Sequence, residues 1–238
     1  MNSVIFCEGR VDAVLIGQYL VAHRGWVYSQ KPKENLKLER EDDKQIIYIY
    51  KRNDDWVYVW AVGGRNRFKS PLETIKVNNH RQESANKVNN IVILIDNDDG
   101  DEAQIRTEFN SYFDTTGLQN NEWVDFSYQD SFSFDNIAKV LLLIIPFDEP
   151  GAMETVMIHS LQEDDDEDLI PQCCGFVDNI RTRKYLQNRR LKLKAKLSTI
   201  VSIIEPDRGS DNLVNLVSSI RWHKYDSVHQ AFKKLLEL

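Results

Sequence analysis

The chain has 238 residues, of which 42% are hydrophobic, and its formal net charge is −7. This length and hydrophobic content are enough for a real core, and the ten glycines and six prolines are too few for a low-complexity chain. The acidic balance argues against a protein that binds nucleic acid through a broad basic surface, although bound metal ions can supply positive charge locally.

The predicted elements alternate between strands and helices. Strands are predicted where β-branched, aromatic and other apolar residues run together, and helices where apolar residues recur at helical spacing. In chain order they are a strand over 3–7, a helix over 10–23, a hairpin of strands 46–50 and 56–62, a helix from 70 to about 87, a strand over 90–95, a helix over 102–113, a strand over 140–145, and helices over 152–161, 177–186, 191–204 and 227–236. The order predicts a single α/β domain over 1–238, with a β-hairpin insertion at about 25–68 and a helical C-terminal region at about 175–238.

The start of the chain and the three cysteines indicate where in the cell the protein is expected. The first ten residues, MNSVIFCEGR, have neither the basic region nor the cleavage site of a signal peptide, and no run of eighteen apolar residues occurs in the sequence. The three cysteines show neither a disulfide framework nor the ligand spacing of a zinc site. We therefore expect a cytoplasmic protein that makes no membrane contact.

Charge is unevenly distributed along the chain. The acidic run 163–168 is interpreted as a solvated loop. Residues 181–196 include eight Lys or Arg and no acid, which indicates either a phosphate-binding face or a solvated helix face. After the hairpin, GGRNRF indicates either a glycine turn or a close approach that brings Arg65 and Arg67 to a substrate.

Acidic residues stand where predicted strands end. Glu8 follows the first strand, with Asp12 one helical turn later, and Asp96 and Asp98 follow the strand over 90–95. In an open α/β sheet, ligands bind outside the carboxyl ends of the strands. Asp96 and Asp98 are expected to point the same way, because side chains of an extended chain repeat every two residues.

Carboxylates this close repel one another unless they are protonated or paired with cations, so the pattern predicts a metal site. Asp148 follows a third strand, and Glu154 lies on the helix behind it. Oxygen ligands favour Mg²⁺, with Mn²⁺ as the alternative ion. A calcium loop of the EF-hand type does not fit, because Gly100 and Thr107 occupy ligand positions five and twelve. A merely solvated acidic loop is the other interpretation.

The segments CEGRVDAVLIGQYL and ILIDNDDGD together resemble a Toprim domain, the catalytic module shared by bacterial primases, type IA and II topoisomerases and the overcoming-lysogenisation-defect nucleases. The Toprim pattern is a Glu after the first strand and a D-x-D after a later one, which Glu8, Asp96 and Asp98 match. The resemblance implies a Rossmann-like, mostly parallel sheet flanked by helices. EPGAMETVMIHSL and KAKLSTIVSIIEPDRG also resemble uncharacterised bacterial Toprim-like proteins related to phage-defence effectors.

The nuclease branch of this family implies roles for the acids. Glu8, Asp96 and Asp98 would be catalytic residues that hold one metal ion. Asp12 and Glu154 match the additional acids of that branch and would support this ion or hold a second one.

The same branch implies basic and substrate-binding residues. A downstream lysine would stabilise the negative charge on the phosphate; Lys194 is our choice, with Lys196 and Lys192 as alternatives. Gly9, Arg10 and Lys196 are candidates for contacting the substrate, Gly9 through its backbone N–H. Arg10 is equally well explained as a solvent-exposed residue of the first helical turn.

The expected function is Mg²⁺-dependent hydrolysis of phosphodiester bonds in nucleic acid. The alternative is a non-catalytic Toprim module that binds nucleic acid or a partner protein, and a third hypothesis is a toxin-like effector that acts on RNA. The nuclease branch usually carries an ATPase, but no G-x-x-x-x-G-K-[ST] motif occurs here, so an ATPase would be a separate chain. The sequence leaves open the choice between DNA and RNA, and whether the chain forms a homo-oligomer.

Overall fold

A computed structural model describes residues 1–36, 38–98, 100–182, 184–208 and 212–238. In these ranges the strands are β1 (Asn2–Cys7), β2 (Val27–Ser29), β3 (Ile46–Arg52), β4 (Asp55–Ala61), β5 (Asn90–Asp96), β6 (Trp123–Gln129) and β7 (Asp135–Ile145). The α-helices are α1 (Arg10–Arg24), α2 (Lys69–Arg81), α3 (Glu102–Tyr112), α4 (Met153–Gln162), α5 (Leu169–Asn179), α6 (Arg189–Ile204), α7 (Leu213–Ser219) and α8 (Asp226–Phe232). Short 3-10 helices cover Arg65–Arg67, Ser84–Asn86, Pro206–Arg208, Trp222–Lys224 and Lys233–Glu237.

The chain folds into two compact units, which are described separately. The sheet unit comprises residues 1–95, 101–144 and 234–238, and the helical unit comprises 96–100 and 145–233. Among the described residues, no helix has both the length and the apolar character needed to cross a membrane.

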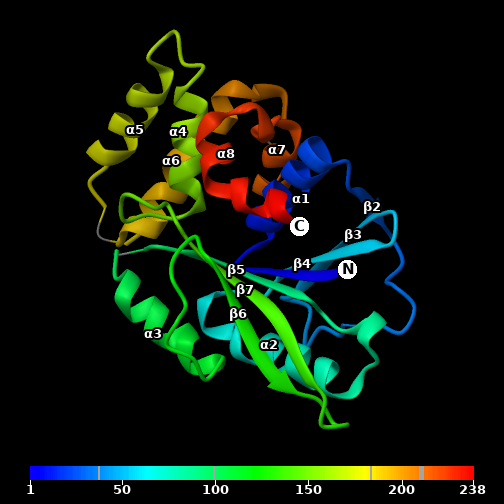
Figure 1. Ribbon diagram of the computed structural model, residues 1–238. Coiled ribbons are helices and arrows are strands. Elements are labelled where there is room, and N and C mark those ends of the chain that lie inside the picture. The colour runs from blue at the N-terminus through cyan, green and yellow to red at the C-terminus, as the bar shows by residue number, and fades with distance from the viewer. Residues whose placement is uncertain (37, 99, 183, 209–211) are drawn as a thin grey trace. The chain divides into compact units, whose positions relative to one another are not determined.

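The seven strands form one sheet in the order β2-β3-β4-β1-β5-β7-β6 (Figure 1). The central strand β1 pairs in parallel with β4 and with β5. The pairs β2–β3, β3–β4 and β6–β7 are antiparallel. The predicted α/β class is therefore confirmed, with a mixed sheet whose centre is parallel. The β3–β4 hairpin, expected as an insertion, is part of this sheet, because residues 56–61 of β4 pair with β1.

Both faces of the sheet carry helices of the sheet unit (Figure 1). On one face a buried cluster joins Phe6, Trp60 and Ile93 of the strands to Leu72 of α2 and Phe109 of α3. Helix α1 packs on β3 and β4 at the other face. Burial of large apolar side chains on both faces stabilises this arrangement through the hydrophobic effect.

Helix α2 ends at Arg81, well before the predicted end near Lys87. Gln82 is extended, and the side chain of Asn79 binds both backbone groups of Val88: its Oδ1 accepts from the N–H and its Nδ2 donates to the C=O, each at 2.8 Å. These two bonds hold the chain where it returns toward β5. The predicted length was wrong because propensity alone does not show a bond between residues nine positions apart.

A buried ion pair fixes the β6–β7 turn. Lys87 Nζ lies 2.6 Å from Asp130 Oδ2 and donates to Asn136 Oδ1 at 2.8 Å, and the paired Lys87 and Asp130 side chains are 6% and 4% exposed. The Lys87 ammonium, together with hydrogen bonds from Asn136 and from the Phe132 and Phe134 N–H groups, holds the pKa of the Asp130 carboxyl well below its usual range.

We expect Lys87→Met to lower Tm by roughly 10 °C at pH 7, because it leaves the Asp130 carboxylate buried without its cation. In the wild type the lowered pKa of Asp130 stabilises the folded state at pH values above about 4, the usual carboxyl pKa. This stabilisation is lost as the pH falls below about 4 toward the lowered pKa. In the variant, Asp130 protonates more readily. Melting curves should therefore show a Tm difference between the wild type and Lys87→Met that narrows below about pH 4. The exposed Lys69→Met is the control, and an equal Tm loss in both variants would contradict the assignment.

The helical unit is built around α4, most of whose residues are buried. Helices α5, α6 and α8 pack against it. The predicted helix over 177–186 was wrong. Helix α5 begins at Leu169, where Asp165 accepts hydrogen bonds from the N–H groups of Leu169 and Ile170, and Ile180 after its end is extended. Helix α7 was not predicted.

The acidic run 163–168 is largely exposed, as expected, but it also fixes helix starts. Glu163 accepts hydrogen bonds from the N–H groups of Asp226 and Ser227 at the beginning of α8, each at 2.8 Å. Burial opposes ionisation of Glu163, yet these bonds and the Ser227 hydroxyl keep its pKa below the usual value. The run therefore has a structural role in addition to its solvation.

Candidate functional site

The acidic segment Asp96–Gly100 is fastened to the chain that leads into α4. Asn97 N–H donates to Ile145 C=O at 2.7 Å, and Asp98 N–H donates to Gly151 C=O at 2.6 Å. Asp98 has φ = 40°, a left-handed conformation that Asp adopts more readily than most residues. The segment is thus held by backbone bonds within the helical unit.

Three of the predicted site residues meet around the start of α4. Asp96 Oδ1 accepts the N–H of Met153, the first residue of the helix, at 2.9 Å. A helix N-terminus favours such a negative charge. The next residue, Glu154, has a side chain only 11% exposed, and Lys194 Nζ of α6 lies 3.6 Å from its Oε1. Two acids and a lysine are therefore placed at one helix end.

Side chains of the basic stretch 181–196 contact two different segments of the helical unit. Arg189 Nη1 donates to the backbone C=O of Asp98 at 3.2 Å. Lys196 Nζ instead pairs with Asp178 of α5 at 2.8 Å. Lys194 thus pairs with a predicted metal-site acid, whereas Lys196 pairs with an acid outside that set. Arg183 lies outside the described residues.

In the sheet unit, Glu8 and Asp12 stand at the junction of β1 and α1. The backbone C=O of Glu8 accepts from the N–H groups of Gly63 and Gly64, each at 3.0 Å. GGRNRF therefore approaches Glu8. Asp12 is buried, and its Oδ2 accepts the Gly9 N–H at 2.7 Å. The N–H that was expected to face a phosphate is engaged by Asp12, which gives Asp12 a role at the start of α1.

Two arginines of the sheet unit have protein partners. Arg10 is exposed, and its Nε donates to the Tyr48 hydroxyl at 3.3 Å. Arg67 Nη2 lies 2.6 Å from Asp42 Oδ2, and this hydrogen bond lowers the pKa of Asp42. Arg67 therefore orders the loop before β3, and its contact with a substrate stays a prediction.

The other acids that follow the predicted strand ends lie at separate positions. Asp101 Oδ1 accepts the Gln104 N–H at 3.0 Å and caps α3, and Asp148 is exposed in the loop after β7. Asp99 lies outside the described residues. Across the part of the chain that the structure describes, no group of three or more His, Cys, Asp or Glu side chains is arranged to hold a metal ion. The metal site stays a prediction.

Asn97 is a polar residue of this loop that sequence reasoning missed. It is 7% exposed, and its Nδ2 donates to the C=O groups of Pro146 and Glu149 at 3.0 and 3.1 Å. Its Oδ1 is buried and has no hydrogen-bond partner among the described residues. A buried acceptor left in this state costs free energy. The only sequence signal was its position between Asp96 and Asp98.

Gly100 is required by the conformation of the acidic segment. Its φ is 82°, and a Cβ there would lie 2.9 Å from Pro150 Cγ. We expect Gly100→Ala to reduce the free energy of unfolding by about 1–3 kcal/mol in equilibrium urea unfolding. Gly175 of α5 has open space around its Cβ position, so Gly175→Ala should be neutral or stabilising. Equal effects of the two substitutions would contradict this account.

The family model described as "Protein of unknown function (DUF3226)" matches residues 2–237. The chain belongs to the DUF3226 family. It is also similar to the crystal structure of hypothetical protein PH0156 from Pyrococcus horikoshii OT3, with a TM-score of 0.55 and 15% identity over 99% of this chain and 92% of that one. At this identity the likeness of the DUF3226 chain to that structure concerns the fold alone. No curated protein matches the sequence at a significant level.

Proposed function

We propose that this DUF3226 protein is a metal-dependent phosphodiesterase of the Toprim type that acts on nucleic acid. The observation that supports the proposal best is the setting of the D-x-D segment in the helical unit. Asp96 is bound at the start of α4, Glu154 pairs with Lys194, and Arg189 contacts Asp98. Arg189 is thus joined directly to the segment that carries Asp96 and Asp98, and the Glu154–Lys194 pair lies at the helix start that Asp96 binds.

The donor atoms of the segment suit Mg²⁺ or Mn²⁺. Asp96 and Asp98 offer carboxylates, and the buried Asn97 Oδ1 is an unsatisfied oxygen of the kind that these ions accept. Mg²⁺ needs only one or two carboxylates, because water and substrate phosphate complete its coordination. A bound ion would supply stabilisation of charge on the phosphoryl oxygens and a more acidic water.

Glu8 is proposed as a further catalytic acid, because it matches the Glu of the Toprim pattern. It follows Cys7, the last residue of the central strand β1, and so stands at the carboxyl end of a strand, where ligands of open α/β sheets bind. Asp12, whose Oδ2 is bonded to Gly9, would position the turn that carries Glu8.

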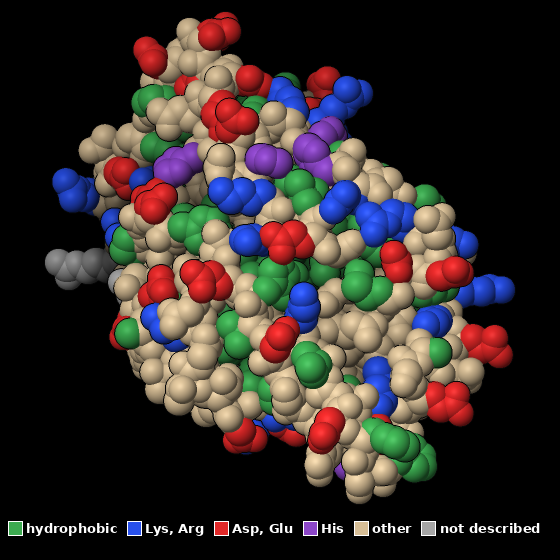
Figure 2. Space-filling model, viewed as in Figure 1, with side chains coloured by type: hydrophobic (Ala, Val, Ile, Leu, Met, Phe, Trp, Pro, Cys, Tyr) green, Lys and Arg blue, Asp and Glu red, His purple; other side chains and the backbone are tan. Residues whose placement is uncertain are grey.

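Phosphate binding is assigned to the basic stretch, in spite of the acidic total. Figure 2 shows acidic and basic side chains intermingled on the visible face, so any attraction for a polyanion would be local. Lys194 would stabilise charge that develops on the phosphate. A guanidinium has five N–H donors, so Arg189 can contact Asp98 and a phosphate oxygen together.

The proposal is tested by cleavage assays on single-stranded, duplex and supercoiled DNA and on structured RNA, with Mg²⁺ or Mn²⁺ against EDTA. Cleavage that requires the ion and disappears in Asp96→Asn/Asp98→Asn would support it. Absence of cleavage on every substrate, with nucleic-acid binding retained in the double variant, would indicate the non-catalytic module instead. Normal cleavage by Glu8→Gln would remove Glu8 from the site.

A further inference from the structure

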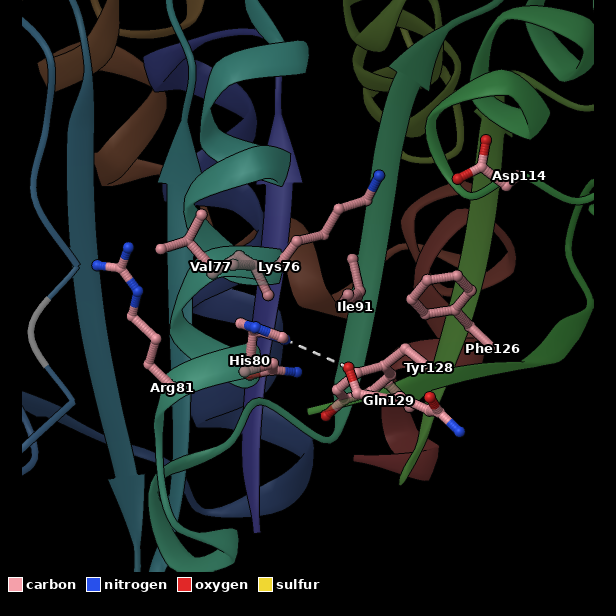
Figure 3. Close-up of a pocket in the computed structure, with 12 residues that line it drawn as sticks. Lys76, Val77, His80, Arg81, Ile91, Asp114, Phe126, Tyr128 and Gln129 are labelled. Atoms are coloured by element: carbon pink, nitrogen blue, oxygen red, sulfur yellow. Dashed lines mark hydrogen bonds between the residues drawn. The ribbon is translucent and has the colours of Figure 1, made fainter. Parts of the chain in front are cut away.

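A cavity of about 340 Å³ lies in the sheet unit between α2 and the strands β5, β6 and β7. Helix α2 contributes one wall, with Ile75, Lys76 and His80 among its residues, and β6 contributes Phe126 and Tyr128. In Figure 3, Lys76 and His80 lie on the side of α2 nearer to these two aromatic rings, whereas Arg81 extends away from them. None of the residues proposed for phosphodiester cleavage lines this cavity.

The cavity is present because one face of β7 carries large apolar side chains over most of its length and a small one at Ala138. Val140, Leu142 and Ile144 fill the space under α2 and α3 as part of the buried cluster. Ala138 continues this face of the strand, since side chains alternate, but it offers only a methyl group. Phe126 is directly opposite Ala138 on β6 and forms a wall of the cavity beside it. A single small residue thus leaves room for a ligand.

The walls suit a planar apolar molecule. The Phe126 and Tyr128 rings are nearly parallel, at 18°, with centroids 5.8 Å apart, and Phe113 packs edge-on against Phe126. Ile75 and Ile91 add aliphatic surface. An engineered apolar cavity of about 150 Å³ holds benzene. A cavity of about 340 Å³ therefore accommodates a body of two fused rings with a substituent.

The rim of the cavity carries the polar side chains Lys76, His80 and Asp114. Lys76 Nζ binds Glu73 Oε1 and the Tyr112 C=O, which uses two of its three N–H donors. His80 Nδ1 lies 3.3 Å from the Gln129 C=O, so Nδ1 carries the proton and Nε2 is the ring atom left for a ligand. Asp114 is the one acid among the described residues that line the cavity. The remaining N–H donor of Lys76, beside an apolar wall, favours a ligand with one anionic group that accepts it.

We propose that this cavity binds a small planar molecule of about two fused rings that carries one anionic group. The rings lie against Phe126 and Tyr128, above Ala138. The anionic group accepts a hydrogen bond from the third N–H of Lys76 and lies beside the His80 ring.

The probes are 2-naphthoate and its neutral analogue 2-naphthylmethanol, titrated against the full chain by NMR. We expect saturable binding of 2-naphthoate below 1 mM, with shifts at Phe126 and Tyr128, and at least threefold weaker binding of the alcohol. Ala138→Leu should weaken binding of 2-naphthoate at least tenfold. Ser127→Leu places the same side chain on the opposite face of β6 and should leave binding unchanged. Lys76→Met should reduce the preference for the acid over the alcohol.

Three results would overturn the proposal: no binding of 2-naphthoate to the wild type at 1 mM, equal binding by Ala138→Leu, or equal binding of acid and alcohol. Circular dichroism and Tm establish that each variant is folded. If the leucine variant does not fold, Ala138→Val fills less space and should still weaken binding by at least threefold.

Discussion

Asp96→Asn is expected to lower the rate of metal-dependent cleavage by roughly 1000-fold, equivalent to about 4 kcal/mol of transition-state stabilisation. The asparagine Oδ1 can still accept the Met153 N–H that Asp96 accepts at 2.9 Å, so the start of α4 is kept. What is lost is the negative charge that would hold a cation. The expected result is therefore a folded protein with unchanged Tm and almost no activity.

Asp166→Asn is the matched control for this prediction, because it removes one negative charge from an exposed residue of the acidic run. It should cleave at the wild-type rate. Wild-type activity in Asp96→Asn would contradict the metal site, and an equal loss in both variants would indicate a general charge effect. Tm measured on each variant separates a loss of folding from a loss of chemistry.

Lys194→Met is expected to reduce kcat by roughly 100-fold with a smaller change in KM, because a fixed cation stabilises charge that develops mainly in the transition state. Its Nζ lies 3.6 Å from Glu154 Oε1, and 47% of the side chain is exposed, so the ammonium is placed without being buried. Lys194→Arg should recover part of the rate, and Lys192→Met should have little effect.

Removal of Lys194 also leaves the largely buried Glu154 carboxylate without its partner. The double variant Lys194→Met/Glu154→Gln separates the loss of stability from the loss of catalytic rate. It should recover stability lost in the single variant but not the rate. Recovery of the rate would mean that Lys194 acts only by neutralising Glu154, contrary to the proposal.

The strands of the sheet centre could be predicted because their signals are local. The run NIVILI before Asp96 is continuous and apolar, and it forms β5 in parallel with β1. Strand β6 was missed, although Val124, Phe126 and Tyr128 alternate with polar residues in the pattern of a half-buried edge strand. The end of α2 was misplaced because it depends on a contact between residues nine positions apart, the bonds of Asn79 to Val88.

For the candidate site, the sequence identified residue types and strand ends but not their partners. The position of Asp96 at the start of α4 depends on a hydrogen bond across 57 residues. The choice among the lysines depends on helix packing, because Lys194 pairs with α4 and Lys196 with α5. The engagement of the Gly9 N–H by Asp12 is local, and the spacing of a capping interaction indicates it.

The most direct test of the metal site is a titration of Mn²⁺ into the protein, followed by electron paramagnetic resonance of the free ion, with Mg²⁺ as competitor. We predict saturable binding to the wild type that Mg²⁺ displaces and that Asp96→Asn/Asp98→Asn abolishes. Equal binding by the wild type and the double variant, or no binding by either, would contradict it.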